Sequence, residues 1–296
     1  MSGRISVPSR VVLVDKPAGC TSYDVVRRVK HGLSDKVGHA GTLDPFATGL
    51  LLVLVGQATR ISSLLMDLPK EYAVRVRFGA TSSTGDPDGV IEETGGTVAG
   101  VAEVVGALDR FRGVISQRVP MTSAVRVAGE RLYKKAHRGE EVETPVREIV
   151  IYDLTLVGFD VESQHADLIA RVGKGTYVRR LAQDIDEALG VGAYASSLRR
   201  TRVGTLSVHD ATPPDAVDPG HLMGVDPGCL TVSTALRHLP VVTLTGTEAT
   251  RAANGGEVRD GPAGRFLVRS EAGLLGVWEG STDAARPVVV FPSPQD

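Results

Sequence analysis

One segment punctuated by glycine and proline constrains this chain more than any other. Residues 38–49 are Gly-His-Ala-Gly-Thr-Leu-Asp-Pro-Phe-Ala-Thr-Gly, and the apolar residues 50–55 follow directly. Glycine and proline interrupt regular structure, whereas a short continuous apolar run is typical of a strand buried on both faces. Pro45 lacks a backbone donor and disfavours helix at the preceding residue, Asp44. The sequence therefore predicts a loop that presents an aspartate beside a buried strand.

Hydrophobic periodicity around this loop predicts a chain that mixes helices and strands. Apolar and polar residues alternate over residues 71–78, which is the pattern of a half-buried strand with Tyr72 on its buried side. Thr21 or Ser22 is expected to cap a helix whose apolar face includes Val25 and Leu33. Further strands are expected at residues 11–14, 147–157 and 166–172, and further helices at residues 58–66, 102–111 and 129–138 and in a segment ending at residue 189.

Length and composition allow one large domain and a small appendage. The chain has 296 residues, 42% of them hydrophobic, and a single core stops growing at roughly 250 to 300 residues. Residues 1–212 are expected to form the large domain. Residues 213–239 contain several prolines and glycines and are predicted to be linker-like. Short β-rich segments around one small helix predict a compact, β-barrel-like domain at residues 240–296.

The distribution of charge indicates which part of the chain would bind a polyanion, and the cysteine content indicates the cellular compartment. The formal net charge is −2, but residues 1–202 hold 27 Lys and Arg against 24 Asp and Glu, whereas residues 203–296 hold 6 against 11. A polyanion is therefore expected to bind the first two thirds of the chain. Two unpaired cysteines, no metal-ligand cluster, no signal peptide and no apolar run long enough for a bilayer predict a cytoplasmic protein without a metal.

The candidate site residues also have ordinary structural explanations. An Asp-Pro pair is a common turn starter, so Asp44 alone does not indicate catalysis. Tyr72 fits a core aromatic, Arg179 a surface arginine and His39 a solvated loop residue. A functional assignment therefore depends on the residues around them.

Residues 38–49 as a whole closely resemble the catalytic motif of the TruB family, the bacterial tRNA pseudouridine-55 synthases. The resemblance extends in order and spacing to residues 13–19, 70–72, 84–89, 120–124 and 173–179. It implies an α+β fold with a mixed, mainly antiparallel sheet flanked by helices, an RNA-binding insertion at about residues 112–147 and a PUA-like C-terminal domain. It also implies that a uridine in the TΨC loop of tRNA, at position 55, is flipped out and isomerised to pseudouridine, without a cofactor.

The resemblance assigns roles to individual residues. Asp44 matches the essential aspartate, Tyr72 is implied to stack on the uracil, and Arg179 is implied to pair with Asp44. The remaining substrate-binding residues implied or expected are His39, which would fill the space of the flipped base, Lys16 with Pro17, which would support the pocket, Tyr177, Leu198, Lys174 and Arg126. Two basic clusters are candidates for phosphate contacts: Arg126, Arg131, Lys134, Lys135 and Arg138, and Arg199, Arg200 and Arg202. The family often has Tyr and Lys where this chain has Thr122 and Arg126.

Two rival functions remain. A non-catalytic tRNA-binding or tRNA-folding factor would use the same groove without turnover. A hydrolase based on Asp44 and His39 is weaker, because two side chains in one glycine-rich loop do not make a positioned triad. A related enzyme guided by a separate RNA is disfavoured because the chain has no long basic tail. The expected partner is therefore tRNA alone, bound by a monomer without an obligatory protein partner or a membrane.

Overall fold

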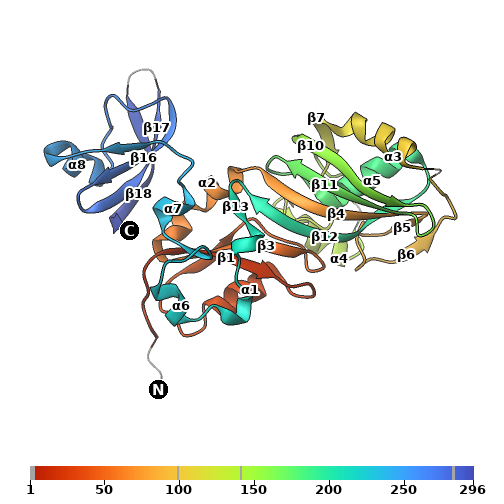
Figure 1. Cartoon of the computed structure of the whole chain (residues 1–296), viewed down its shortest axis with the longest axis horizontal. Helices are drawn as coiled ribbons and strands as arrows, with labels where there is room; N and C mark the ends of the chain where they lie inside the picture. Colours follow the sequence, from red (N-terminus) through yellow and green to blue (C-terminus); the bar gives the residue numbers. More distant parts are fainter. Residues whose placement is uncertain (1–3, 99, 141, 282–283) are drawn as a thin grey trace.

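The computed structural model describes residues 4–98, 100–140, 142–281 and 284–296. A large sheet dominates the first part of the chain, and a small β domain follows at the C-terminal end (Figure 1). Within the described residues, no helix is both long and apolar enough to cross a bilayer.

The large sheet is mixed and almost entirely antiparallel, as predicted. Only the contact between β3 and β12 is parallel. In spatial order its strands are β14 (Cys229–Leu230), β1 (Arg10–Lys16), β3 (Thr48–Val55), β12 (Ala193–Val203), β4 (Lys70–Phe78), β11 (His165–Val172), β10 (Val146–Asp160) and β7 (Gly113–Arg118), with β2 (Val37–Ala40) beside β3 and β13 (Leu206–Ser207) beside β12.

Eight α-helices and four 3-10 turns lie within the described residues. The α-helices are α1 (Ser22–Val29), α2 (Ser62–Asp67), α3 (Val101–Leu108), α4 (Leu132–His137), α5 (Val178–Leu189), α6 (Pro219–Met223), α7 (Val232–Ala235) and α8 (Gly246–Ala253). The 3-10 turns are η1 (Gly56–Ile61), η2 (Asp109–Phe111), η3 (Val208–Asp210) and η4 (Pro214–Ala216). Two small hairpins are formed by β5 (Ala80–Ser82) with β6 (Ile91–Glu93), and by β8 (Arg126–Val127) with β9 (Glu130–Arg131).

Strand β3 is buried on both faces, which explains its continuous apolar sequence. Leu51 and Val53 pack into a core shared with α1, α3 and α5, whereas Leu50 and Leu52 face a second core with α2 and α7. Strand β4 differs, because its buried residues alternate with exposed ones such as Arg75. Helices therefore cover both faces of the sheet at β1 and β3, and only one face toward the β7 edge.

Two segments differ from the sequence-based expectation. Residues 193–203 were not predicted as a strand, yet β12 lies at the centre of the sheet between β3 and β4. Residues 213–239 were predicted to be linker-like, but β14 pairs with β1, and Leu222 and Leu236 are fully buried. Prolines there begin η4 and α6 at positions where the missing donor is tolerated, so they start structure instead of interrupting it.

The C-terminal domain is a four-stranded sheet with one helix, α8. Its strands, in spatial order, are β15 (Val241–Thr243), β16 (Gly264–Ser270), β17 (Gly273–Gly280) and β18 (Ala285–Gln295). Phe266 and Trp278 centre its own core. Leu267 and Leu274 instead join the second core of the large sheet, with α2 and α7. The domain is therefore packed against the large sheet and not merely tethered to it.

Candidate active site

The loop between β2 and β3 carries Asp44 and is held by hydrogen bonds to its backbone. The Ser22 hydroxyl, at the start of α1, donates to the carbonyl oxygen of Leu43 at 3.1 Å and accepts from the Leu43 N–H at 2.9 Å. The carbonyl oxygen of Pro45 accepts from the Gly19 N–H at 2.9 Å. The helix start is itself fixed by a capping box at Thr21. Residues 43–45 are thus tied to the N-terminal elements on both sides of the aspartate.

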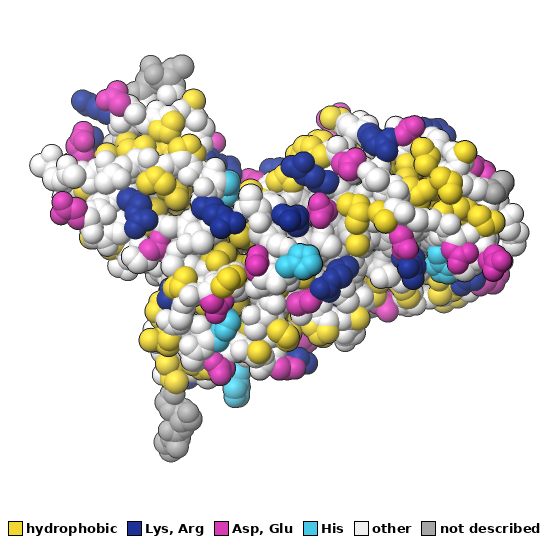
Figure 2. Space-filling view, in the orientation of Figure 1, with side chains coloured by type: hydrophobic (Ala, Val, Ile, Leu, Met, Phe, Trp, Pro, Cys, Tyr) yellow, Lys and Arg dark blue, Asp and Glu magenta, His cyan; other side chains and the backbone are white. Residues whose placement is uncertain are grey.

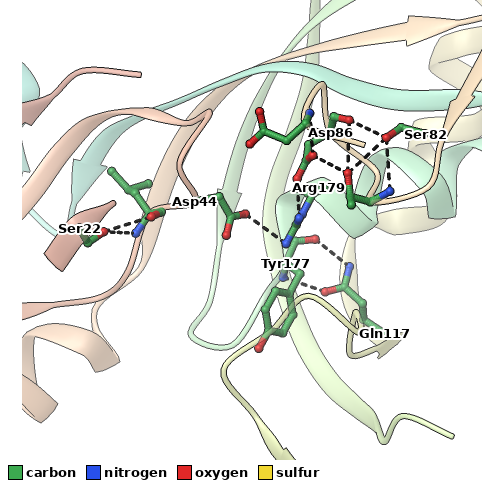
Figure 3. A network of polar contacts seen from close by, with 10 residues as sticks. Ser22, Asp44, Ser82, Asp86, Gln117, Tyr177 and Arg179 are labelled. Atoms are coloured by element: carbon green, nitrogen blue, oxygen red, sulfur yellow. Dashed lines mark hydrogen bonds and ion pairs between the residues drawn. The ribbon is translucent and has the colours of Figure 1, made fainter. Parts of the chain in front are cut away.

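Asp44 faces Arg179, which lies in the first turn of α5. Nη2 of Arg179 is 3.3 Å from Oδ2 of Asp44, and Figure 3 shows the two side chains pointing toward each other from the loop and the helix. The Arg179 side chain is only 5% exposed, whereas 33% of the Asp44 side chain is exposed. The pairing expected between these residues is present in the structure, and the carboxylate remains open to a ligand.

A second carboxylate, Asp86, shares the same guanidinium. Its Oδ2 pairs with Nη1 of Arg179, and its Oδ1 accepts from the Thr84 hydroxyl at 2.5 Å. The Ser82 hydroxyl donates to the backbone carbonyl of Asp86, so the turn that carries this carboxylate is itself fixed (Figure 3). Arg179 is thereby anchored on its buried side by Asp86 and presented to Asp44 on its open side.

Burial and the positive charge of Arg179 shift the pKa of Asp44 in opposite directions. Burial raises the pKa of the Asp44 carboxyl above its ordinary value, and the Arg179 guanidinium opposes this rise. The negative charge of Asp86 raises the Asp44 pKa further, and Lys16 lowers it. Arg179 was expected to keep Asp44 ionised, and it acts in that direction without overcoming the effect of burial.

Asp44 opens into a cleft of about 590 Å³, which is in the size range of small-ligand sites. The predicted residues that line it are His39, Tyr72, Tyr177, Arg179 and Leu198. They come from β2, β4, the start of α5 and β12. Segments far apart in the sequence therefore meet around one carboxylate.

Tyr72 and Leu198 form a wall supplied by the sheet. Tyr72 is 9% exposed and lies on β4 between its neighbours β11 and β12. Leu198 is 5% exposed on β12. An aromatic ring beside an aliphatic side chain provides an apolar surface against which a planar base can pack.

Tyr177 is held at its backbone by a residue that the sequence did not identify. Gln117, buried on β7, accepts from the Tyr177 N–H at 2.8 Å and donates to the Tyr177 carbonyl at 3.3 Å. Its amide also donates to Asp184 on α5 at 2.9 Å. Figure 3 shows Gln117 beside the Tyr177 backbone, while the tyrosine ring extends away from it.

His39 and Lys16 differ in their access to the cleft. Burial, aided by the charge of Arg200, lowers the pKa of His39, which favours the neutral imidazole. Lys16 is completely buried, and its ammonium donates to the carbonyls of Pro17 at 2.9 Å, Cys20 at 2.7 Å and Pro45 at 3.2 Å. Lys16 therefore contacts the backbone of the loop that carries Asp44 and does not line the cleft.

Lys174 and Arg126 lie outside the cleft. Lys174 pairs with Asp67 at 2.9 Å, and Asp67 also pairs with Arg265 of the C-terminal domain at 3.1 Å. Arg126 lines a separate, shallow depression. From the same insertion, Arg131 and Tyr133 do line the cleft.

Several arginines proposed for phosphate binding are engaged within the protein. Arg138 makes a two-pronged contact with Glu130 at 2.8 Å and also binds Glu140. Arg199 pairs with Asp15 at 2.8 Å. Arg200 is only 1% exposed, so the expectation that it contacts phosphate is wrong.

The residues of the site that sequence reasoning missed are Asp86 and Gln117, while Ser22 and Arg200 were predicted in other roles, as a helix cap and as a phosphate contact. Asp86 lies in the recognised motif at residues 84–89, but its partner is 93 residues away in the chain. The sequence offers no comparable signal for Gln117. Across the described ranges, no group of three or more His, Cys, Asp or Glu side chains is placed to hold a metal ion.

Comparison with known proteins agrees with this geometry. Residues 28–178 match the model of the N-terminal domain of TruB family pseudouridylate synthases. The chain is 39% identical to tRNA pseudouridine synthase B of Azoarcus sp. (strain BH72), with 95% of each chain covered. It is also 39% identical to tRNA pseudouridine synthase B of Thermobifida fusca (strain YX), with 95% of this chain and 98% of the relative covered.

Solved structures show the same fold at lower identity. A chain in the structure of an H/ACA RNP bound to a substrate RNA containing 2′-deoxyuridine superposes with a TM-score of 0.71 at 23% identity, over 97% of this chain and 86% of that chain. A chain in a Cbf5-Nop10-Gar1 complex gives the same TM-score at 22% identity, with the same coverage. The family match and the two relatives at 39% identity establish that the chain belongs to the TruB family of pseudouridylate synthases.

Proposed function

We propose that this protein is an isomerase that converts the uridine at position 55, in the TΨC loop of tRNA, to pseudouridine, with Asp44 as its catalytic carboxylate. The observation that carries the proposal is an aspartate, one third exposed, that is aimed by a buried arginine into a cleft of about 590 Å³. Full-length relatives named tRNA pseudouridine synthase B support tRNA as the substrate.

The chemistry requires the target base to leave its stack. The C–N bond between uracil and ribose breaks, the uracil turns, and a C–C bond forms between its C5 and the ribose C1′. An enzyme that acts on these atoms must extrude the nucleotide into a pocket. In this proposal Tyr72 stacks on the uracil, Tyr177 and Leu198 complete the pocket, and His39 occupies the space that the base leaves.

Asp44 has two possible modes of action in this reaction. The carboxylate can attack C1′ of the sugar or C6 of the uracil, or it can stabilise positive charge at the sugar. Arg179 directs the carboxylate in each case. Atoms are only rearranged within the nucleotide, so the proposed reaction uses no cofactor.

RNA binding outside the cleft is proposed for the insertion at residues 112–147. Arg126 is exposed there, and Arg131, from the same insertion, lines the cleft. The side chain of Lys174 is 70% exposed. It pairs with Asp67, which also binds Arg265 of the C-terminal domain. We propose these cations as phosphate contacts, while Lys16 supports the loop from inside. We also propose that the enzyme is monomeric and cytoplasmic and works without an obligatory protein partner.

Tritium release from tRNA labelled at C5 of uridine tests the proposal, because C5 loses its hydrogen when the C–C bond forms. Wild-type protein should release tritium, and Asp44→Asn should abolish release while binding tRNA about as tightly. Asp153→Asn is the matched control, because it makes the same change at an exposed aspartate on β10, and it should retain activity. Binding without release by the wild type would instead favour a tRNA-binding or tRNA-folding factor.

The position of the product tests the substrate assignment separately. A tRNA with cytidine in place of uridine 55 should bind but yield no pseudouridine. Pseudouridine formed at another position of that tRNA would show that the reaction is right and the target wrong.

A further inference from the structure

Arg200 is a buried cation that the proposed mechanism does not use. Its side chain is 1% exposed, and its hydrogen bonds within the described structure are to backbone carbonyl oxygens. Removing a guanidinium from water is costly unless its donors are satisfied in good geometry. A charged side chain that is buried in this way is therefore expected to have a specific function.

The three nitrogens of Arg200 connect the start of the loop that carries Asp44 with strand β3, which follows it. Nη2 donates to the carbonyl of Gly41 at 3.0 Å, and Nη1 is 3.5 Å from the carbonyl of Thr42. Nε donates to the carbonyl of Leu50 at 2.6 Å. The first two acceptors precede Asp44 and the third follows it. A rigid guanidinium fork can fix the separation of two such segments, which a single-point ammonium does less well.

The backbone of Arg200 is itself held against the loop. Arg200 is in parallel register with Gly49, at the start of β3. A Cβ at Gly49 would lie 2.3 Å from the carbonyl oxygen of Arg200, so only glycine allows this approach. On its other side, Arg200 is in register with Tyr72 on β4. Arg200 therefore connects the strand that carries Tyr72 with the loop that carries Asp44.

We propose that Arg200 is a positioning residue for Asp44, which sets the loop so that the carboxylate meets a nucleotide held against Tyr72 and Leu198. This inference rests on the proposed function and adds a residue that acts through the loop and does not touch the substrate. Ser22 holds Leu43, so the segment directly before Asp44 is fixed both by Arg200 and by the start of α1.

Steady-state kinetics on full-length tRNA, with three variants of the full chain, tests this proposal. A displacement of about 1 Å in a catalytic group reduces turnover about 100-fold. Arg200→Gln should therefore lower kcat about 100-fold and leave KM within about twofold, since the substrate-binding surface is unchanged. Arg200→Lys retains the positive charge but replaces the planar guanidinium with a single ammonium, and it should lower kcat about tenfold.

Arg10→Gln is the matched control. Arg10, at the start of β1, is also a buried arginine, 8% exposed, and donates to the backbone carbonyls of Gly224 at 3.0 Å and Ser9 at 3.1 Å, outside the loop that carries Asp44. Its loss should reduce thermal stability while kcat stays within about twofold at a temperature where the variant is folded. A purely structural role for Arg200 would make the two sites behave alike.

The outcomes separate the inference from the proposed function. Wild-type kcat in folded Arg200→Lys would overturn the positioning role, and so would a loss confined to KM in either Arg200 variant. If Arg200→Gln does not fold, Arg200→Lys decides the question alone. No turnover by the wild type on any tRNA would instead overturn the proposed function.

Discussion

Two carboxylates, Asp44 and Asp86, share the Arg179 guanidinium, and Arg179 and Asp86 shift the pKa of Asp44 in opposite directions. Asp86 is 3% exposed and fixes the arginine, whereas Asp44 is open to the cleft. Asp86 therefore holds the positive charge of Arg179 in place beside Asp44, and Arg179 is not a freely moving surface residue. The proposed reaction needs the ionised form of Asp44, so its pKa determines the acid limb of the pH profile.

The pH profile of turnover should reflect the raised pKa of Asp44. Activity should fall as the pH drops through this pKa, at a higher pH than for an ordinary aspartate, because burial disfavours the charged carboxylate. Asp86→Asn removes a negative charge that raises the Asp44 pKa, so the acid limb should move to lower pH. Its plateau kcat should fall about tenfold, because Arg179 loses its anchor. An acid limb that stays in place or moves to higher pH would refute this electrostatic account.

Tyr72 offers a ring and a hydroxyl that can be tested separately. Stacking of a base on an aromatic side chain contributes about 1–3 kcal/mol, so Tyr72→Leu should weaken productive binding by roughly 10- to 100-fold in kcat/KM. Tyr72→Phe preserves the ring and should retain tRNA affinity while lowering kcat, if the phenol assists removal of the proton from C5. Pseudouridine formation under single-turnover conditions measures both effects. Full turnover by Tyr72→Phe would exclude a chemical role for the hydroxyl.

The junction between β3 and β12 places the loop that carries Asp44 beside the cleft wall. Gly49 has φ of +99°, and a Cβ there would collide with the backbone of Arg200. Gly49→Ala should therefore reduce the free energy of unfolding by more than about 2 kcal/mol. Gly106→Ala is the matched control: it lies within α3 with open space around it, and should raise stability by roughly 0.5–1 kcal/mol. Urea denaturation measures both, and equal effects would argue against a tight strand junction.

The sequence predicted those elements whose periodicity is regular. The apolar run of β3, the alternation of β4 and the short strands of the C-terminal domain are all present close to their expected positions. Strand β12 escaped prediction because register shifts between Ala195 and Ser197, and between Arg200 and Arg202, break its period of two. Its arginines also suggested a solvated face, although Arg200 is buried.

The candidate site was predictable only in part, because some of its contacts join residues that are far apart in the sequence. The motif around Asp44 identified the carboxylate, and the family resemblance identified Tyr72, Tyr177, Arg179 and Leu198, which all line the cleft. Asp86 and Gln117 act through contacts that span 93 and 60 residues of sequence. A single sequence does not reveal which distant side chains meet, so these supporting contacts required the fold.

The two domains share one hydrophobic core, which ties their stabilities together. Figure 2 shows the C-terminal domain rising from the body of the molecule, with a hollow between them. Beneath it, Leu274 and Phe291 of the C-terminal domain pack in the core that contains Leu64 of α2 and Leu236, which follows α7. A shared core favours cooperative unfolding of the whole chain.

Calorimetry of a core variant tests this coupling. Leu274 is fully buried, and Leu274→Ala should lower stability by about 2–5 kcal/mol. The variant should still unfold in one transition, at a lower temperature than the wild type. Val241→Ala, at a residue that is 54% exposed in the same domain, should change stability by less than about 0.5 kcal/mol. Two separate transitions, with only one of them shifted in Leu274→Ala, would show that the domains unfold independently.

The most direct measurement is a crystal structure of the protein bound to a TΨC stem-loop that carries 5-fluorouridine at the target position. We expect the target nucleotide to be flipped into the cleft, with its base against Tyr72 and an Asp44 carboxylate oxygen within reach of C1′ or C6. A target nucleotide still stacked in the RNA loop, or bound in the cleft with Asp44 turned away from it, would disprove the account.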